Sequence, residues 1–274
     1  MIIRISIYFI ELDDVATILV FGGRDADLHL LFNSMDDGLV NFYESENPYL
    51  YFAYILFFPI YVIPFEISVY IWDFLRLISV IYIVKNIYKI TDDRNDLYFF
   101  YIFSIIGYLV DTFLNNSNWL ILFLLFESYI QLKKDRKILA GILFTLTTYK
   151  IILLIFPFAL IISKKIKLKG LVYYFVPFFL ICLPYLIFPN YFSEMLSNWR
   201  YESKDVYYQN ILFISWRVFQ TAQLLFISYI VLIFLDSLQW NKNKVRILLC
   251  ILLVLIYFIL IVSLISVKFV RDYI

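Results

Sequence analysis

Two aspartates separated by a single residue, Asp25 and Asp27, stand in a polar stretch of an otherwise apolar chain. A carboxylate can take the proton from a hydroxyl group that is hydrogen-bonded to it, and two carboxylates can hold Mg²⁺ or Mn²⁺ together with substrate oxygens. In an extended loop, residues i and i+2 point the same way, so we expect both carboxylates to face one cavity. The competing interpretation is a solvated acidic loop, because four more acidic residues follow: Asp36, Asp37, Glu44 and Glu46.

Lys150 lies in the middle of the apolar run Ile138–Ile162. Placing a cation inside a bilayer costs about 2.5–3.5 kcal/mol on insertion scales, so intramembrane charges usually mark function or an ion pair. The alternatives for Lys150 are a snorkelling side chain and a structural pair with Glu127 or Asp73. Asp73 also stands three residues before Arg76, a helical spacing that predicts an internal, structural salt bridge.

The elements that position these residues belong to a chain of 274 residues, of which 63% are hydrophobic and 21% aromatic. Soluble domains average about 45–50% apolar residues, so the composition predicts an all-α, polytopic integral membrane protein with membrane lipid as a partner. A net charge of +1 and the lack of a basic stripe argue against nucleic acid as a partner. The single histidine excludes a metal site built from two imidazoles.

About eight transmembrane or re-entrant helices are expected in a single membrane domain, 1–274. A span needs about 20 helical residues, so two of the apolar runs are short, and the N-terminal run 2–22 is interrupted by acidic residues. The seven clearer runs are Ile67–Val84, Leu97–Val110, Trp119–Leu132, Ile138–Ile162, Leu171–Phe188, Ile211–Leu235 and Ile247–Val267.

The charges between these runs predict the orientation of the chain. The linkers 85–96, 133–137, 163–170 and 238–246 carry 14 of the 23 lysines and arginines, whereas the intervening loops 23–50, 111–118 and 190–210 carry ten of the 22 acidic residues. Because basic linkers stay in the cytoplasm, the acidic loops are expected on the non-cytoplasmic side.

Two segments depart from simple alternation. Ile138–Ile162 lies between two basic linkers, so both of its ends are expected in the cytoplasm, and 25 residues are too few to cross twice. We therefore predict a hairpin of two short helices that turns near Tyr149 and Lys150 and enters the bilayer partway, which requires protein or a water-filled cavity around the turn. The aromatic segment 49–65, interrupted by Pro59 and Pro64, is expected at the outer membrane interface.

The order of these features resembles that of GT-C fold glycosyltransferases, in particular glycosyltransferase family 87 and the catalytic subunit of GPI mannosyltransferase I. The resemblance covers about residues 21–220, although Leu28 stands where an aromatic residue often follows the second aspartate, and the expected proline after Lys150 is displaced to Pro157. The motifs that carry it are Asp25-x-Asp27, Phe32, Gly38, Asn47-Pro48-Tyr49, Asn115-Asn116-Ser117-Asn118-Trp119, Lys133–Lys137, Ala140-Gly141-Ile142-Leu143, Lys150 and Tyr208-Gln209-Asn210.

The resemblance implies an inverting transferase that moves a sugar, typically mannose, from a polyprenyl or dolichyl phosphate to a glycolipid or glycoprotein on the non-cytoplasmic side of the cell membrane or endoplasmic reticulum. It implies Asp25 and Asp27 in the outer catalytic loop 22–50 as candidates for the base, with a metal ion, if any, between them. It places Lys150 at the donor phosphate. The further substrate-binding candidates are His29 and, from the outer loop 190–210, Arg200, Lys204 and Asn210; Arg217 in the next span is an additional cation.

Two alternatives remain open. Broken helices, an intramembrane lysine and paired acids also suit a transporter of a lipid or solute, although no repeated halves are visible and the polar residues concentrate in the outer loops. The short chain and the irregular first run also suit a non-catalytic or degenerate relative that serves as a partner subunit of an assembly. His29 could equally be an ordinary loop residue, and Asn115-Asn116-Ser117 matches an N-glycosylation signal.

Overall fold

The computed structural model describes residues 25–44, 49–91, 111–112 and 115–201, and every regular element within these ranges is helical. This confirms the all-α class for the described part of the chain. The elements are α3 (Ala26–Asp36), α4 (Ala53–Tyr61), α5 (Phe65–Thr91), α7 (Asn118–Lys133), α8 (Lys137–Thr145), the 3-10 helix η1 (Ile151–Ile155), α9 (Phe156–Ile162), the 3-10 helix η2 (Leu168–Leu171), α10 (Val172–Ile181), α11 (Pro184–Ile187) and α12 (Pro189–Tyr201).

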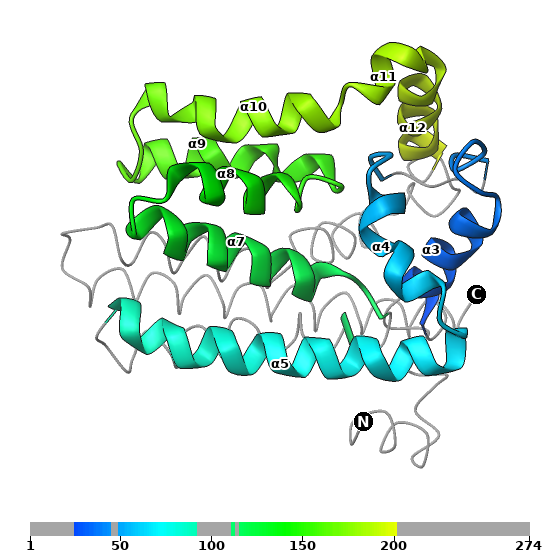
Figure 1. Cartoon of the computed structure of the whole chain (residues 1–274), viewed down its shortest axis with the longest axis horizontal. Helices are drawn as coiled ribbons and strands as arrows, with labels where there is room; N and C mark the ends of the chain where they lie inside the picture. The colour runs from blue at the N-terminus through cyan, green and yellow to red at the C-terminus, as the bar shows by residue number, and fades with distance from the viewer. Residues whose placement is uncertain (1–24, 45–48, 92–110, 113–114, 202–274) are drawn as a thin grey trace, which may run out of the picture.

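The longer helices run side by side and are stacked in layers (Figure 1). Helix α5 forms one outer layer, α7 lies above it, α8 and α9 form the next layer, and α10 covers them. Helices α3, α4, α11 and α12 gather at the end of the stack where α5 and α7 begin. The basic linker 133–137 and the start of α10 lie at the opposite end, so the predicted basic and acidic connections are separated as the alternation requires.

Helix α5 corresponds to the predicted run Ile67–Val84 and contains a stretch, Phe65–Ile87, that is long and apolar enough to cross a membrane. Pro64 lies between α4 and α5 and has no backbone N–H to donate, so the helix is interrupted there. Helix α5 begins at the next residue, Phe65. The Ser68 hydroxyl donates to the carbonyl oxygens of Ile60 and Ile63 at 2.9 and 3.1 Å. These bonds satisfy carbonyl groups that the end of α4 leaves without an intrahelical donor.

The two short helices and the turn predicted within Ile138–Ile162 are confirmed, and the partial entry into the bilayer stays a prediction. Helix α8 ends at Thr145, residues 146–150 turn, and η1 leads into α9, which lies beside α8 (Figure 1). The segment returns to the end of α7 where it began: the Lys165 ammonium group, just after α9, is 5.9 Å from the centroid of the Tyr129 ring of α7, and Lys133 of α7 itself is 5.7 Å from the same centroid. The tip of the hairpin therefore reaches toward the start of α7.

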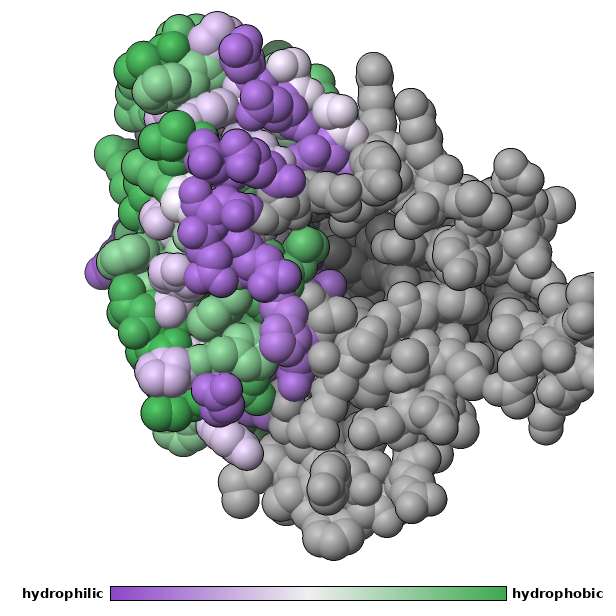
Figure 2. All heavy atoms as spheres, turned by 90° about the vertical axis from the view of Figure 1, so that its right-hand side faces the viewer, coloured by the Kyte–Doolittle hydropathy of each residue, from purple (hydrophilic) through white to green (hydrophobic). Residues whose placement is uncertain are grey.

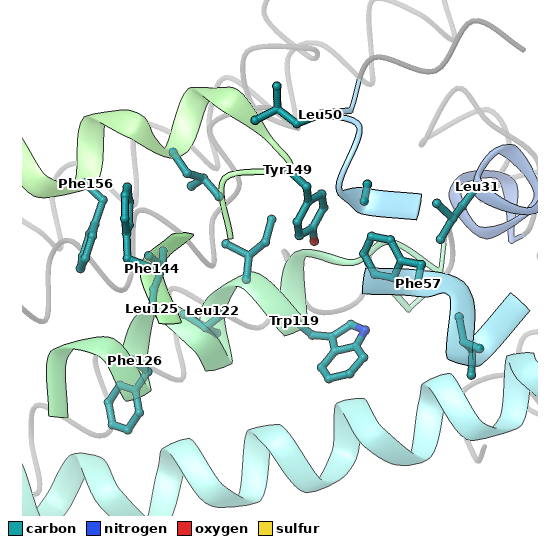
Figure 3. Packing of buried hydrophobic residues seen from close by; sticks show 14 of the residues in the cluster. Leu31, Leu50, Phe57, Trp119, Leu122, Leu125, Phe126, Phe144, Tyr149 and Phe156 are labelled. Carbon is teal, nitrogen blue, oxygen red and sulfur yellow. The ribbon is translucent and has the colours of Figure 1, made fainter. Parts of the chain in front are cut away.

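Close packing holds the body of this hairpin. Gly141 of α8 lies so near α10 that a Cβ atom there would be 1.7 Å from the Tyr173 carbonyl oxygen. Phe144 stacks on Phe156 of α9 with ring centroids 5.7 Å apart. Figure 3 shows how the apolar core continues from these rings along α7, past Leu125 and Leu122, to Trp119 and Phe57.

Three predictions need correction or lie outside the described residues. The extended conformation expected for Asp25 and Asp27 is wrong, because a helix, α3, begins at Ala26 and occupies much of the loop 22–50. The loop 190–210 likewise contains α12. The run 2–22, the spans Leu97–Val110, Ile211–Leu235 and Ile247–Val267, and the linker 238–246 lie outside the described residues, so the total of about eight helices stays a prediction.

Candidate functional site

Lys150, at the tip of the hairpin, is bound by the asparagines that precede and begin α7. Its ammonium group donates to Asn116 Oδ1 and Asn118 Oδ1, both at 2.8 Å. The Tyr49 ring lies beside it, with the centroid 5.6 Å from Nζ. Hydrogen bonds and a ring face therefore hold a cation in a half-buried position at the end of the stack that carries α3 and α4.

Asp27 joins the same group of side chains. The Asn116 carboxamide accepts from Lys150 through Oδ1 and donates to the Asp27 carboxylate through Nδ2. One carboxamide thus separates the half-buried carboxylate from the ammonium group. Asp27 lies in the first turn of α3, where the positive end of the helix dipole stabilises a negative charge.

A second carboxylate, Asp111, is connected to Lys150 through Asn118. The Asn118 carboxamide accepts from Lys150 and donates through Nδ2 to Asp111 Oδ1 at 2.8 Å. Asp111 is buried, with only 4% of its surface exposed. Burial raises its pKa to about 6, and the charges of Arg76 and Lys150 and the Asn118 hydrogen bond limit that rise, whereas Asp27 adds to it. The predicted loop 111–118 places this group outside the membrane spans.

A second buried cation completes the polar group. The Arg76 guanidinium of α5 donates to Asp73 Oδ1 at 2.8 Å and to Asn115 Oδ1 at 2.6 Å. The predicted Asp73–Arg76 salt bridge is therefore confirmed, but the same arginine also contacts the asparagine run. We use the name polar network for the side chains of Asp27, Asp73, Arg76, Asp111, Asn115, Asn116, Asn118 and Lys150.

The backbone around the network is fixed by several contacts between distant segments. Asn115 has a φ of 55°, a conformation that asparagine adopts more readily than most residues. The Trp72 indole donates to the Asn116 carbonyl oxygen at 3.4 Å, and the Tyr149 hydroxyl donates to that of Ser117 at 3.2 Å. In Figure 3, Tyr149 reaches from the hairpin turn toward α7, between Leu122 and Phe57. The Leu50 N–H donates to Tyr149 O at 3.0 Å, which attaches segment 49–65 to the tip.

Of the other predicted site residues, Asp25 is buried directly before α3, with a φ of 59°. His29 is exposed and its ring stacks on Phe65 at 3.9 Å between centroids; because residues i and i+2 of a helix do not share a face, it does not point the same way as Asp27. Arg200 lies in the last turn of α12, and nothing is described of its side chain, whereas Lys204, Asn210 and Arg217 lie outside the described residues.

Sequence reasoning missed Asp111, Asn116 and Asn118 as site residues and treated Arg76 as structural only. The sequence signal for these residues is a run of polar residues, 115–118, directly before an apolar helix. This run contributes to the family resemblance and matches a glycosylation signal, but it does not by itself indicate contact with Lys150. Asn115 is 1% exposed and accepts a hydrogen bond from Arg76, so its side chain is not exposed as a site for N-glycosylation.

The described residues contain no group of three His, Cys, Asp or Glu side chains close enough to hold a metal ion. Dependence on Mg²⁺ or Mn²⁺ stays a prediction.

The end of the molecule that carries α3, α4 and α12 has a polar face. Figure 2 shows this face, where hydrophilic side chains form a continuous band beside an apolar flank. The polar network lies at the same end of the stack, since Lys150 and Asn118 lie at the start of α7 and the basic residues Lys133 and Lys137 lie at its other end. The 16 residues of α7 separate the two ends by about 24 Å at 1.5 Å per residue.

A comparison with known families decides the class of protein. The model of glycosyltransferase family 87 matches residues 49–271. The chain belongs to this family. Membership in glycosyltransferase family 87 confirms the resemblance found in the sequence, and it implies a membrane GT-C transferase that uses a lipid-phosphate sugar donor. No curated protein and no solved structure matches the chain.

The family 87 match covers one part of the polar network. Arg76, Asp111, the asparagines and Lys150 lie within it, whereas Asp25 and Asp27 precede its first residue, Tyr49. The contact between Asp27 and Asn116 joins the unmatched segment to the matched one.

Proposed function

We propose that this chain transfers a sugar, in the first instance mannose, from a polyprenyl phosphate to the hydroxyl group of a glycolipid or glycoprotein acceptor, with inversion. Asp27 is the base and Lys150 binds the donor phosphate. The observation that carries the proposal is that one carboxamide, that of Asn116, contacts both groups. A base and a cation this close can act on the two ends of one displacement.

In the transfer step, the acceptor oxygen forms a bond to the anomeric carbon while the bond from that carbon to the phosphate oxygen breaks. The acceptor proton passes to the carboxylate of Asp27, which is only half-buried. Negative charge grows on the departing polyprenyl phosphate, and the Lys150 ammonium stabilises it. Because base and leaving group lie on opposite sides of the anomeric carbon, the configuration inverts.

The site faces the non-cytoplasmic side in this proposal. The basic residues 133–137 and 163–169 belong to the end of α7 remote from the polar network, and basic connections remain in the cytoplasm. The donor chain lies in the bilayer beside the exposed apolar side chains of α5, such as Phe74 and Ile78, and delivers its phosphate to the hairpin tip.

Asp27→Asn tests the proposal, and Asp25→Asn is its matched control. Each change replaces one carboxylate with a carboxamide. Residue 25 has a positive φ, which asparagine adopts more readily than most residues. We expect membranes that contain the native chain or Asp25→Asn to transfer radiolabel from polyprenyl-phosphate mannose to lipid. We expect Asp27→Asn to lose at least 100-fold of this rate, the magnitude of general-base catalysis, at equal protein level.

Loss of transfer in Asp25→Asn with full activity in Asp27→Asn would overturn the assignment of the base. If the native chain transfers no label from mannose, glucose, galactose or arabinose donors, the transferase proposal fails in favour of the non-catalytic subunit.

A further inference from the structure

Lys150 does not contact Asp111 directly in the hydrogen bonds described above; a single carboxamide connects them. Asn118 Oδ1 accepts from the Lys150 ammonium at 2.8 Å, and Asn118 Nδ2 donates to Asp111 Oδ1 at 2.8 Å. A carboxylate only accepts and an ammonium group only donates. The orientation of the Asn118 carboxamide is therefore determined by both neighbours at once.

We propose that Asp111 and Asn118 are positioning residues for the donor phosphate, because they hold the Lys150 ammonium at the place where that phosphate binds. The inference rests on the proposed function and goes beyond it, since neither residue touches the reacting atoms. It assigns Lys150 to direct contact with the phosphate, and it assigns Asn118 and Asp111 to fixing the place and the charge of Lys150.

The side chain of lysine explains why such support is needed. Lysine has a flexible four-carbon side chain, so fixing its head group in one place costs conformational entropy. Asn116 and Asn118 restrain Nζ from two sides, and the Tyr149 hydroxyl fixes the backbone between them through Ser117 O. Asn116 also serves Asp27, so the support that belongs to Lys150 alone is the one through Asn118.

Charge gives the second argument. A half-buried ammonium group loses part of its hydration, and a nearby negative charge offsets that loss. Asp111 is buried beside two cations, Arg76 and Lys150, and its carboxylate interacts with both. The groups that face it are Arg76 from α5, Asn118 from α7, Lys150 from the hairpin tip and Asp27 from α3. Asp111 thus reaches Lys150 through the Asn118 carboxamide, whereas Asp27 reaches it through that of Asn116.

Binding of polyprenyl phosphate to the purified full chain in lipid nanodiscs tests the inference without requiring transfer. We expect Asn118→Leu, which keeps the shape and removes both hydrogen bonds, to weaken binding about tenfold, the loss of one hydrogen bond to a charged group. Asp111→Asn, which keeps a hydrogen-bond acceptor, should weaken it by a smaller factor. Asn86→Leu is the matched control, because Asn86 is partly buried, donates to Tyr82 O and is remote from the network.

A double-mutant cycle separates positioning from a structural role. In a Lys150→Met background, Asn118→Leu and Asp111→Asn should each change polyprenyl phosphate binding less than twofold, since their effect passes through the missing ammonium group. Additive losses in that background would overturn the inference. Thermal unfolding of each variant reports whether the fold is retained, and the conservative Asp111→Asn keeps the test decisive if Asn118→Leu does not fold.

Kinetics with the complete donor provide the second readout. Positioning of the phosphate-binding group predicts a raised KM for the donor with an unchanged KM for the acceptor in Asn118→Leu. Native protein that does not bind polyprenyl phosphate would refute the donor site, and hence the proposed function. Binding that depends on Lys150 but is unaltered by Asn118→Leu and Asp111→Asn would refute the positioning inference alone.

Discussion

The body of the hairpin 137–162 is held by close packing, whereas its tip is held by hydrogen bonds. In the body, Gly141 packs directly on the α10 backbone and Phe144 stacks on Phe156. At the tip, Lys150 and Tyr149 are held by hydrogen bonds to Asn116, Asn118 and Ser117 O. Packing tolerates exchange among side chains of similar volume, whereas the tip depends on which atom donates and which accepts.

This difference separates what the hairpin needs in order to fold from what it needs in order to act. The body brings the chain back to Tyr129 of α7, where Lys165 lies beside the ring, and so fixes how far the tip reaches. The tip presents a cation to the polar network at the end of the molecule that carries α3. Substitutions in the body should therefore lower the yield of folded protein. Substitutions at the tip should lower activity while the protein stays folded.

The largest effect is expected for Gly141→Val. The Cβ atom would lie 1.7 Å from the Tyr173 carbonyl oxygen and 2.6 Å from its carbonyl carbon, and backbone atoms of a packed helix cannot move aside cheaply. Helices α8 and α10 must separate, which should cost more than about 4 kcal/mol, at the upper end of single-residue effects. The amount of monodisperse protein after detergent extraction, together with its thermal unfolding, measures this loss.

Gly38→Ala is the control for Gly141→Val. Gly38 has a φ of +80°, and a Cβ there would meet nothing within 4 Å. Only the strain of a positive φ applies, which costs about 1–2 kcal/mol, so folded protein should remain. Equal losses at the two glycines would show that the α8–α10 contact is not what holds the hairpin body.

Much of the hairpin could be predicted from the sequence, because charge and length suffice for it. Two basic linkers around 25 apolar residues require a turn within the bilayer, and Tyr149 and Lys150 supply polar groups for it. Helix α5 was likewise visible as an apolar run, Ile67–Val84, and the structure extends it to Phe65–Thr91. Hydrophobic length is a one-dimensional property, so a single chain reveals it.

The polar network could not be derived in the same way. Asp27 and Asn116 are 89 residues apart, and Lys150 and Asn118 are 32 apart, so no local pattern shows that they meet. The conformation of Asp25-x-Asp27 was predicted wrongly because acidic residues in a polar stretch fit a loop and the first turn of a helix equally well. The sequence does not indicate a site role for Asp111, because a single carboxylate after an apolar run is typical of a solvated loop residue.

Asp111→Asn is expected to raise the unfolding free energy at pH 7, by less than Gly141→Val lowers it. Burial raises the pKa of Asp111 to about 6, so the folded protein favours the protonated carboxyl more than the unfolded chain does. The native chain therefore loses unfolding free energy as the pH rises from about 4 to about 6. The shift of about two units corresponds to at most about 3 kcal/mol, and Asp111→Asn should recover part of it at pH 7.

The difference in unfolding free energy between native chain and Asp111→Asn, measured in nanodiscs from pH 4 to pH 8, isolates this contribution from other titrating groups. The variant should be the more stable protein at pH 7 and should approach the native chain at pH 4. Lower stability of the variant throughout would show that Asp111 supports the fold through Asn118, and that the tip shares the role assigned to the body.

The smallest effect is expected at the base of the hairpin, for Lys165→Gln. The Lys165 and Lys133 ammonium groups lie 5.9 and 5.7 Å from the Tyr129 ring centroid, and a partly exposed cation–π contact contributes about 0.5–1 kcal/mol. Glutamine keeps a polar head and removes the charge, so the unfolding free energy should fall by an amount of this order. Polyprenyl phosphate binding should be unchanged, because the contact lies at the other end of α7 from Lys150.

Lys133→Gln removes the other cation at the same ring, from within α7 itself, and it should also cause only a small loss. If Lys165→Gln weakened binding as Asn118→Leu is expected to, the base of the hairpin would help to position its tip, and the separation between the two regions would fail.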